Sequence, residues 1–313
     1  MENHQLTTES INPNTQAIDH LSTSEILTIM NQEDRHIPDA IEKVIPAITK
    51  VVDAVVKVIK GGGRVFLVGA GTSGRLGILE AAECPPTFGV EPTLFQGVIA
   101  GGHEAIFHAI ENAEDDRTQG GRDLEARGLT DRDAVIGIAA SGRTPYVIGA
   151  LEWAKKKHAT TIALACNERS IIGQIADYKI EAIPGPEVIS GSTRMKAGST
   201  QKIILNMITT TAMIKTGKVY RNLMVDLHIS NHKLKERAIN ILQLATGTDR
   251  EVAAKALEAS ESHVKEAIVM LKKNVDFEKA KQLLQAAGGY VREAIEEEEG
   301  LPRNDHLARY SSL

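Results

Sequence analysis

Three loops rich in glycine, serine and threonine are the parts of this sequence best suited to chemistry. They read GAGTSG at 69–74, SGRT at 141–144 and GSTRMK at 191–196, and each precedes a helical pattern. Hydroxyl groups and backbone N–H groups at helix starts are the donors that a phosphate monoester needs. We therefore predict a site for a compact phosphorylated molecule. The candidate ligands are Thr72, Ser73, Ser141, Thr144 and Ser192.

The first loop also satisfies the GxGxxG pattern of dinucleotide sites, with Glu91 about 20 residues further on. A second loop of similar design, at 141–144, favours one compact phosphate over a dinucleotide. An NAD-dependent enzyme stays open as an alternative. So does the reading that these small residues only make tight turns between strands and helices.

Two carboxylates are candidates for acid and base chemistry. Glu83 precedes Cys84 and two prolines, which predict that its helix stops there, and Glu114 closes a helical pattern that begins after 101–103. A carboxylate at each of two helix ends can form a general acid and base pair if burial separates their pKa values. The competing interpretation places both on the solvated surface.

Metal or thiol chemistry is not expected. His228 and His232 share a helix face, but no acidic or cysteine partner completes a ligand set. Cys84 is better explained as a small buried thiol than as a nucleophile. The other cysteine, Cys166, makes no CxxC motif, and the first residues lack a signal-peptide pattern, so we expect a cytoplasmic protein without metal or other cofactor.

Composition narrows the possible partners of these 313 residues. Aromatic residues make up only 4% of the chain and the net charge is -5, so no stacking or polybasic surface for nucleic acid is expected. The longest apolar-leaning uncharged stretch, between Lys202 and Lys215, is shorter than the ~20 residues that cross a bilayer. We predict a buried helix there and no membrane partner.

The elements that must position these loops alternate between strands and helices. Apolar runs at 64–68, 134–138 and 161–165 are each followed by a small-residue loop and a helical pattern, which predicts an α/β fold with a doubly wound parallel sheet. Residues 1 to about 35 are polar and aperiodic, and a helix should follow from 37 to 60. Beyond 217 only helices are expected, including three near 249–259, 262–273 and 276–287.

Four longer motifs resemble a known family. They are VGAGTSGRLG at 68–77, AAECPPTFG at 81–89, AASGRTP at 139–145 and GSTRMKAG at 191–198. Together with LTTES at 6–10 they closely resemble the N-acetylmuramic acid 6-phosphate etherases, nearly from end to end.

The resemblance implies a fold and an arrangement of domains. It implies an N-terminal arm and lead-in helix over 1–53, then a sugar isomerase (SIS) domain, flavodoxin-like and three-layered, over 54–217. Residues 218–313 would form a helical region with a small UBA-like three-helix bundle. The protein would be a homodimer.

The resemblance also implies an activity, which is cleavage of the D-lactyl ether of N-acetylmuramic acid 6-phosphate to N-acetylglucosamine 6-phosphate and D-lactate. The family's two catalytic glutamates match Glu83 and Glu114, and we expect Glu114 to act as the base at C2 and Glu83 as the acid on the ether oxygen. Two alternatives remain, namely a non-catalytic sugar-phosphate sensor related to glucokinase regulatory protein and an aldose-ketose isomerase.

Overall fold

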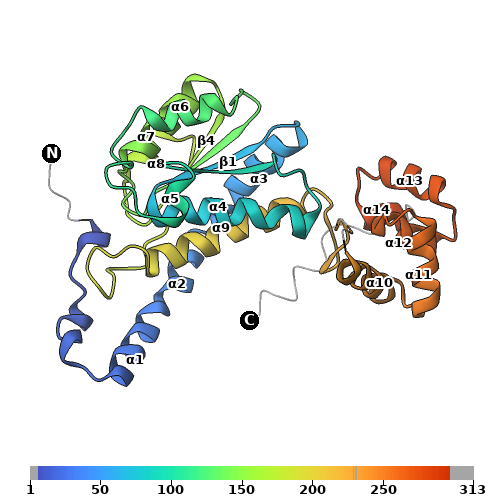
Figure 1. Ribbon diagram of the computed structural model, residues 1–313, viewed down its shortest axis with the longest axis horizontal. Coiled ribbons are helices and arrows are strands. Elements are labelled where there is room, and N and C mark those ends of the chain that lie inside the picture. The colour runs from blue at the N-terminus through green and yellow to red at the C-terminus, as the bar shows by residue number, and fades with distance from the viewer. Residues whose placement is uncertain (1–5, 228, 230, 297–313) are drawn as a thin grey trace. The chain divides into compact units, whose positions relative to one another are not determined.

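The computed structural model describes residues 6–227, 229 and 231–296. The chain divides into two compact units, residues 1–216 and 217–313, each with its own apolar core. Figure 1 labels the helices and strands of both units.

The first unit is built on a five-stranded parallel sheet. Its strands are β1 (Val65–Gly69), β2 (Phe95–Ile99), β3 (Ala134–Ile138), β4 (Thr160–Ala165) and β5 (Tyr178–Glu181), in the order β2-β1-β3-β4-β5. This is the flavodoxin-like order, so the predicted doubly wound fold is confirmed. The three central strands lie where the sequence predicted them. The edge strands β2 and β5 were not predicted, because their partly exposed residues break the apolar runs.

Helices cover both faces of the sheet. On one face lie α3 (Ile45–Lys60), α4 (Gly71–Phe88) and α9 (Lys196–Ile214); on the other lie α6 (Gln119–Ala126), α7 (Pro145–Lys156) and α8 (Ile171–Ile175). Glycines bring α4 close to β1, since a Cβ on Gly77 would lie 3.0 Å from the Leu67 carbonyl oxygen. The predicted buried helix over 202–215 is part of α9.

The N-terminal segment is more ordered than its composition suggested. Short 3-10 turns at Thr7–Glu9, Pro13–Thr15 and Ile18–His20 lead to α1 (Thr23–Asp34), whose start is fixed by a capping box between Ser22 and Glu25. The helix expected over 37–60 is divided into α2 (His36–Glu42) and α3. The break falls before Pro46, which supplies no N–H for a continuous helix.

The second unit is mainly helical. Two short strands, β6 (Val219–Tyr220) and β7 (Leu223–Met224), precede α10 (His232–Thr246), α11 (Arg250–Ala259), α12 (Val264–Lys273), α13 (Phe277–Ala286) and α14 (Val291–Ile295). The three predicted bundle helices correspond to α11, α12 and α13. The two strands and α14 were not predicted. His228 lies outside the described residues.

Among the residues that the structure describes, none of the helices has both the length and the apolar composition needed to cross a bilayer.

Candidate functional site

The loops after β1 and β3 lie side by side at the carboxyl edge of the sheet. Gly69 and Ile138 are partners in the register of the two strands, so the 70–74 and 139–144 loops leave the sheet next to each other. Chain order reverses between these strands, because β1 connects to β2 on one side and pairs with β3 on the other. Such a switch point opens a crevice for ligands in doubly wound sheets.

The start of α4 is open to an anion. Its N-cap, Ala70, has no side chain that accepts a hydrogen bond, and within the described chain no acceptor pairs with the N–H groups of Gly71, Thr72 and Ser73. The first internal bond of the helix is donated by the Gly74 N–H to the Ala70 carbonyl. Three unpaired N–H groups and the helix dipole favour negative charge here.

The hydroxyls of the first loop differ in their surroundings. Ser73 is 8% exposed and its Oγ donates a hydrogen bond to Oε1 of Gln201 on α9, at 2.8 Å. Thr72 is half-buried and packs at the start of α9, where its Cγ2 lies 3.3 Å from the place a Cβ would take on Gly198. The first turn of α9 therefore lies against the first turn of α4.

The second loop is joined to Glu114. The Glu114 carbonyl accepts a hydrogen bond from the Tyr146 N–H in the first turn of α7, at 2.9 Å. Ser141 and Thr144, both half-buried, precede that turn, and Thr144 makes no side-chain cap. The structure thus places Glu114 beside the Ser141–Thr144 loop, although 27 residues separate Glu114 from Ser141 in the sequence.

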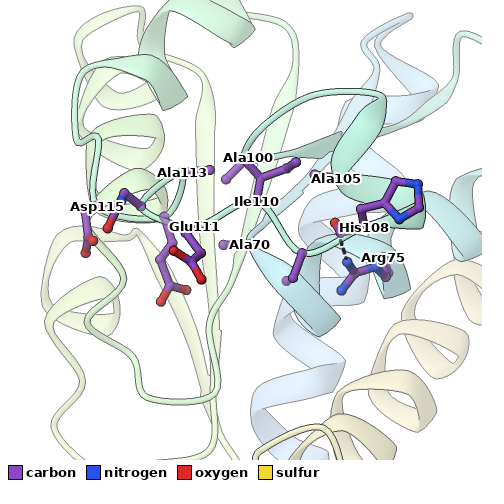
Figure 2. A pocket seen from close by; sticks show the side chains of 13 residues that line it. Ala70, Arg75, Ala100, Ala105, His108, Ile110, Glu111, Ala113 and Asp115 are labelled. Atoms are coloured by element: carbon purple, nitrogen blue, oxygen red, sulfur yellow. Dashed lines mark hydrogen bonds between the residues drawn. The ribbon is translucent and has the colours of Figure 1, made fainter.

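A cavity of about 420 Å³ adjoins the start of α4. Figure 2 shows Glu111 and Asp115 on one side, Arg75 and His108 on the other, and Ala70 between them. Glu114 is also part of the lining. Ala70 and Gly71 supply the wall formed by α4, so the open helix start and a carboxylate share one cavity. Glu111 was missed by sequence reasoning, although it lies three residues before Glu114.

The wall that carries these carboxylates is a loop, which corrects one prediction. The helix expected to end at Glu114 is only the short α5 (Glu104–Phe107), and Glu114 lies in the loop that follows. Arg75 of α4 bonds the backbone where α5 ends and that loop begins. Its Nε donates to the Ile106 carbonyl at 2.9 Å and its Nη2 to the His108 carbonyl at 3.0 Å.

Glu83 lies elsewhere. The helix expected to stop at Glu83 continues through Pro85 and Pro86 to Phe88, and Gly89 ends it in the left-handed conformation. Proline accepts helical φ, so the pair removes two N–H donors without ending α4. Glu83 is exposed, 12 residues beyond Gly71, which corresponds to about 18 Å along the helix axis. Glu83 is not among the residues that line the cavity beside Glu114.

The start of α9 is closed, in contrast to that of α4. The buried Glu187 carboxylate accepts the N–H groups of Lys196 and Ala197, both at 2.9 Å, while the N–H of Gly198 bonds the Thr193 carbonyl. Burial raises the pKa of Glu187 despite these two bonds. Ser192 is half-buried in the preceding loop, and no bond from its hydroxyl is found in the described part of the chain.

Lys196, one of two cations of the third loop, is not available to a ligand. Its Nζ is fully buried and lies 2.5 Å from Oε2 of Glu33 on α1. Burial would raise the pKa of Glu33, but hydrogen bonds from Lys196, Asn14 and Asn12 lower it to about 2. The other cation, Arg194, remains exposed.

The N-terminal segment holds the edges of the site, a role that sequence reasoning missed. Thr8 and Asn167 are joined by two hydrogen bonds, and Asn167 also donates to the Ala140 carbonyl beside Ser141. Thr15 donates to the Val188 carbonyl in the loop before α9. Thr8 and Asn167 are 159 residues apart and Thr15 and Val188 are 173 apart, so no local sequence pattern could reveal these two contacts.

The structure agrees with the interpretation of Cys84 as a buried thiol and not a nucleophile. Both cysteines are buried and unpaired, and burial together with nearby Glu80 raises the pKa of Cys84 to about 12. Among the described residues no group of three or more His, Cys, Asp or Glu side chains is placed to hold a metal ion.

Comparison with known proteins identifies the class of fold. Residues 122–215 match the SIS domain, 47–155 the N-terminal SIS domain of glucokinase regulatory protein, and 221–266 the C-terminal lid domain of glucokinase regulatory protein. Solved structures with similar folds include a phosphoheptose isomerase from Francisella tularensis, 19% identical with a TM-score of 0.49 over 62% of this chain and 99% of that one. The family matches over residues 47–155 and 122–215 make the chain a SIS-domain protein.

Curated relatives narrow this class to one family. The chain is 56% identical to N-acetylmuramic acid 6-phosphate etherase 1 of Bacillus licheniformis, over 87% of this chain and 89% of the relative. It is 55% identical to the etherase of Caldanaerobacter subterraneus, over 88% and 90%. It is 50% identical to that of Aliivibrio fischeri, over 87% and 90%. The chain belongs to the N-acetylmuramic acid 6-phosphate etherase family, and the sensor alternative is not favoured.

Proposed function

We propose that the protein cleaves the D-lactyl ether of N-acetylmuramic acid 6-phosphate, giving N-acetylglucosamine 6-phosphate and D-lactate in the cytoplasmic breakdown of cell-wall amino sugars. Membership of the etherase family carries this proposal. The two free cysteines, both buried, accord with a reducing compartment.

The substrate's phosphate would bind at the open start of α4. Thr72 and Ser73 belong to its first turn, and Ser141 and Thr144 lie in the adjacent loop. Ser192 comes from the loop before α9, the helix whose first turn lies against Thr72. A phosphate that takes no part in the reaction supplies binding energy which holds C2 and C3 of the sugar in place. The reacting carbons would then lie in the cavity beside Glu114.

Glu114 would act as the base. Opening of the sugar exposes a C1 aldehyde, which acidifies the proton on C2. When Glu114 takes that proton, the electron pair of the C2–H bond forms the C2–C3 double bond and the C3–O bond breaks. An acid protonates the departing ether oxygen of lactate. Water then adds to C3, losing its proton to the former acid, and Glu114 returns a proton to C2. The net change consumes one water and needs no cofactor.

The acid, Glu83, would come from a second copy of the chain. Glu83 is exposed on α4 about 18 Å along the helix from the cavity of its own chain. Leu79, one turn earlier, is 45% exposed, and Ile203 on the neighbouring α9 is 40% exposed. Exposed apolar side chains on α4 and α9 accord with a homodimer in which each subunit contributes a carboxylate to the other's cavity.

The first test is D-lactate release from N-acetylmuramic acid 6-phosphate by the wild type, Glu83→Gln and Glu114→Gln. Loss of one proton-transfer group lowers kcat by about 100- to 10,000-fold, so both variants should be nearly inactive. Glu91→Gln, which removes an exposed carboxylate eight residues after Glu83, is the matched control and should keep wild-type kcat. Absence of lactate from the folded wild type would refute the proposed activity.

Mixing the two inactive variants tests the shared site. After subunit exchange at equal concentrations, half of the dimers contain one chain of each kind, and each such dimer holds one site with Glu114 and the partner's Glu83 intact. Activity should return to about a quarter of the wild-type value. If both glutamates acted from the same chain, every site in the mixture would lack one of them and no activity would return.

A further inference from the structure

Only the oxygen of the Gln201 side-chain amide has a hydrogen-bond partner in the described part of the chain. Gln201 lies in the second turn of α9 and is only 1% exposed. Its Oε1 accepts the Ser73 hydroxyl at 2.8 Å, whereas its Nε2 has no hydrogen-bond partner in the described part of the chain. Buried donors are nearly always paired in folded proteins, so an exception calls for an explanation. The group that the amide does bond is a serine in the first turn of α4.

Rotation of the amide by 180° about its last bond gives the nitrogen a partner. Nε2 then faces Ser73 Oγ and donates to it, because a hydroxyl can accept as well as donate. The Ser73 hydroxyl then no longer donates to Gln201, so it can donate a hydrogen bond to another group. The two orientations differ little in shape, since the oxygen and nitrogen of an amide are nearly the same size.

An acceptor for that hydrogen belongs at the start of α4. Ser73 is the third residue of the helix, and its N–H and those of Gly71 and Thr72 lack acceptors in the described structure. An anion held by these groups would lie beside Ser73, a residue that remains 8% exposed. A phosphate oxygen accepts hydrogen bonds only, so it requires Ser73 to act as the donor.

We propose that Gln201 is a positioning residue for the substrate's phosphate. With phosphate bound, Gln201 Nε2 donates to Ser73 Oγ, and the Ser73 hydroxyl donates to a phosphate oxygen. Without phosphate, Ser73 donates to Gln201 Oε1, as in the structure. Gln201 thus acts through Ser73 and touches no reacting atom. This inference rests on the proposed function, since it assigns the phosphate of that substrate to the start of α4.

The expected kinetic effect is confined to binding. The N–H groups at the start of α4 would still hold the phosphate, and with it C2 and C3, so the loss of one hydrogen bond to the phosphate should raise KM and leave kcat nearly constant. Gln201→Leu should raise KM about 10-fold, with kcat within threefold of the wild type. Gln201→Glu keeps the shape but only accepts from Ser73 and adds negative charge, so KM should rise about 100-fold. Thr200→Val is the control, because the buried Thr200 hydroxyl bonds the Lys196 carbonyl of the same helix and not the start of α4.

A double-mutant cycle separates this role from general packing. If Gln201 acts through Ser73, then Gln201→Leu should add little to the rise in KM that Ser73→Ala causes, whereas independent effects would multiply. Multiplying effects, a fall in kcat alone, or an equal rise in KM for Thr200→Val would overturn the proposal. If Gln201→Leu does not fold, the isosteric Gln201→Glu carries the test, and an unchanged KM there would also overturn it.

Direct binding keeps this test apart from that of the activity. The probes are N-acetylglucosamine 6-phosphate and N-acetylglucosamine, titrated into each folded variant by calorimetry. The Gln201 and Ser73 variants should lose affinity for the phosphorylated sugar by the same factors as in KM and show no change for the unphosphorylated one. This result would support Gln201 even if no lactate were released. Equal losses for both sugars, or no binding of the phosphorylated sugar by the wild type, would contradict it.

Discussion

The starts of α4 and α9 follow loops of similar composition and have opposite arrangements. The first-turn N–H groups of α4 lack acceptors in the described chain, and its N-cap is Ala70. Those of α9 are occupied by the Glu187 carboxylate and by backbone carbonyls, and its first side chain, Lys196, pairs with Glu33. A carboxylate built into the protein thus occupies at α9 the kind of position that we assign to a substrate phosphate at α4.

This difference assigns the two helix starts different roles: the start of α9 supports the site, and the start of α4 binds the phosphate. Glu187 bonds the first N–H groups of α9 and Glu33 pairs with Lys196, so that the end of the loop that carries Ser192 is joined to the N-terminal segment by residues of the protein alone. The start of α4 keeps its favourable interaction with negative charge for the ligand. Variants at α9 should therefore change stability, and variants at α4 should change phosphate binding.

The largest expected effect is that of Lys196→Met. Removing one partner of a buried ion pair leaves the Glu33 carboxylate uncompensated, which should lower the free energy of unfolding by about 3–5 kcal/mol. The double variant Lys196→Met/Glu33→Gln removes both charges and should recover more than half of that loss. Denaturant unfolding followed by circular dichroism measures both values.

The same variants also test, through substrate binding, whether the start of α9 takes no part in holding the phosphate. Under conditions where the double variant is folded, its KM for N-acetylmuramic acid 6-phosphate should stay within about threefold of the wild type, because Lys196 is assigned no contact with phosphate. Normal stability together with an increase in KM of about two orders of magnitude would contradict the assignment of α9 to stability and α4 to phosphate binding. It would make Lys196 a ligand.

The sequence could predict that these loops lie at strand ends but not which helix start is open. The motifs at 69–74 and 191–196 both show glycine and hydroxyl residues before a helix. What distinguishes them is Glu33, 163 residues before Lys196, and Glu187 in an irregular loop. A carboxylate that reaches a helix start through tertiary structure leaves no periodic signal. Central strands were predictable because burial on both faces produces continuous apolar runs.

Stability towards acid gives the next largest effect. The pKa of Glu33 is lowered to about 2 in the folded protein from the ordinary value of 4.5. A lowered carboxyl pKa stabilises the fold above the unfolded-state pKa, and this contribution is lost as the pH falls from about 4.5 towards 2. The loss should reach at most about 3 kcal/mol. Unfolding free energies of the wild type and the Lys196→Met/Glu33→Gln variant, compared between pH 6 and pH 3, should converge towards the lower pH. A constant difference would show that Glu33 does not titrate in this way.

The two glutamates show a second limit of sequence reasoning. The sequence predicted both at helix ends, but Glu83 lies inside α4 and Glu114 in a loop. The prolines after Glu83 predict a helix stop, yet α4 accommodates both of them before its actual end at Gly89. The position of Glu114 depends on its carbonyl, which accepts the Tyr146 N–H, and backbone pairing of this kind has no side-chain signature.

The smallest effect is expected when α4 is made to resemble α9. Ala70 has the extended conformation of an N-cap, with φ -119° and ψ 155°. Ala70→Asp should therefore supply the missing cap and raise the free energy of unfolding by about 1 kcal/mol. Its carboxylate would also occupy the N–H groups and repel the phosphate, so that KM should rise about 10-fold or more. A more stable protein with weaker substrate binding is the signature of this variant.

Ala70→Ser separates charge from capping at the same position. A serine hydroxyl caps the helix to a similar extent without negative charge, so the gain in stability should remain while KM rises less than for the aspartate. Thermal unfolding and the KM for N-acetylmuramic acid 6-phosphate provide the two readouts. If Ala70→Asp bound the substrate as well as the wild type, the phosphate would not lie at the start of α4. The contrast with α9 would then be one of stability alone, because neither helix start would hold the ligand.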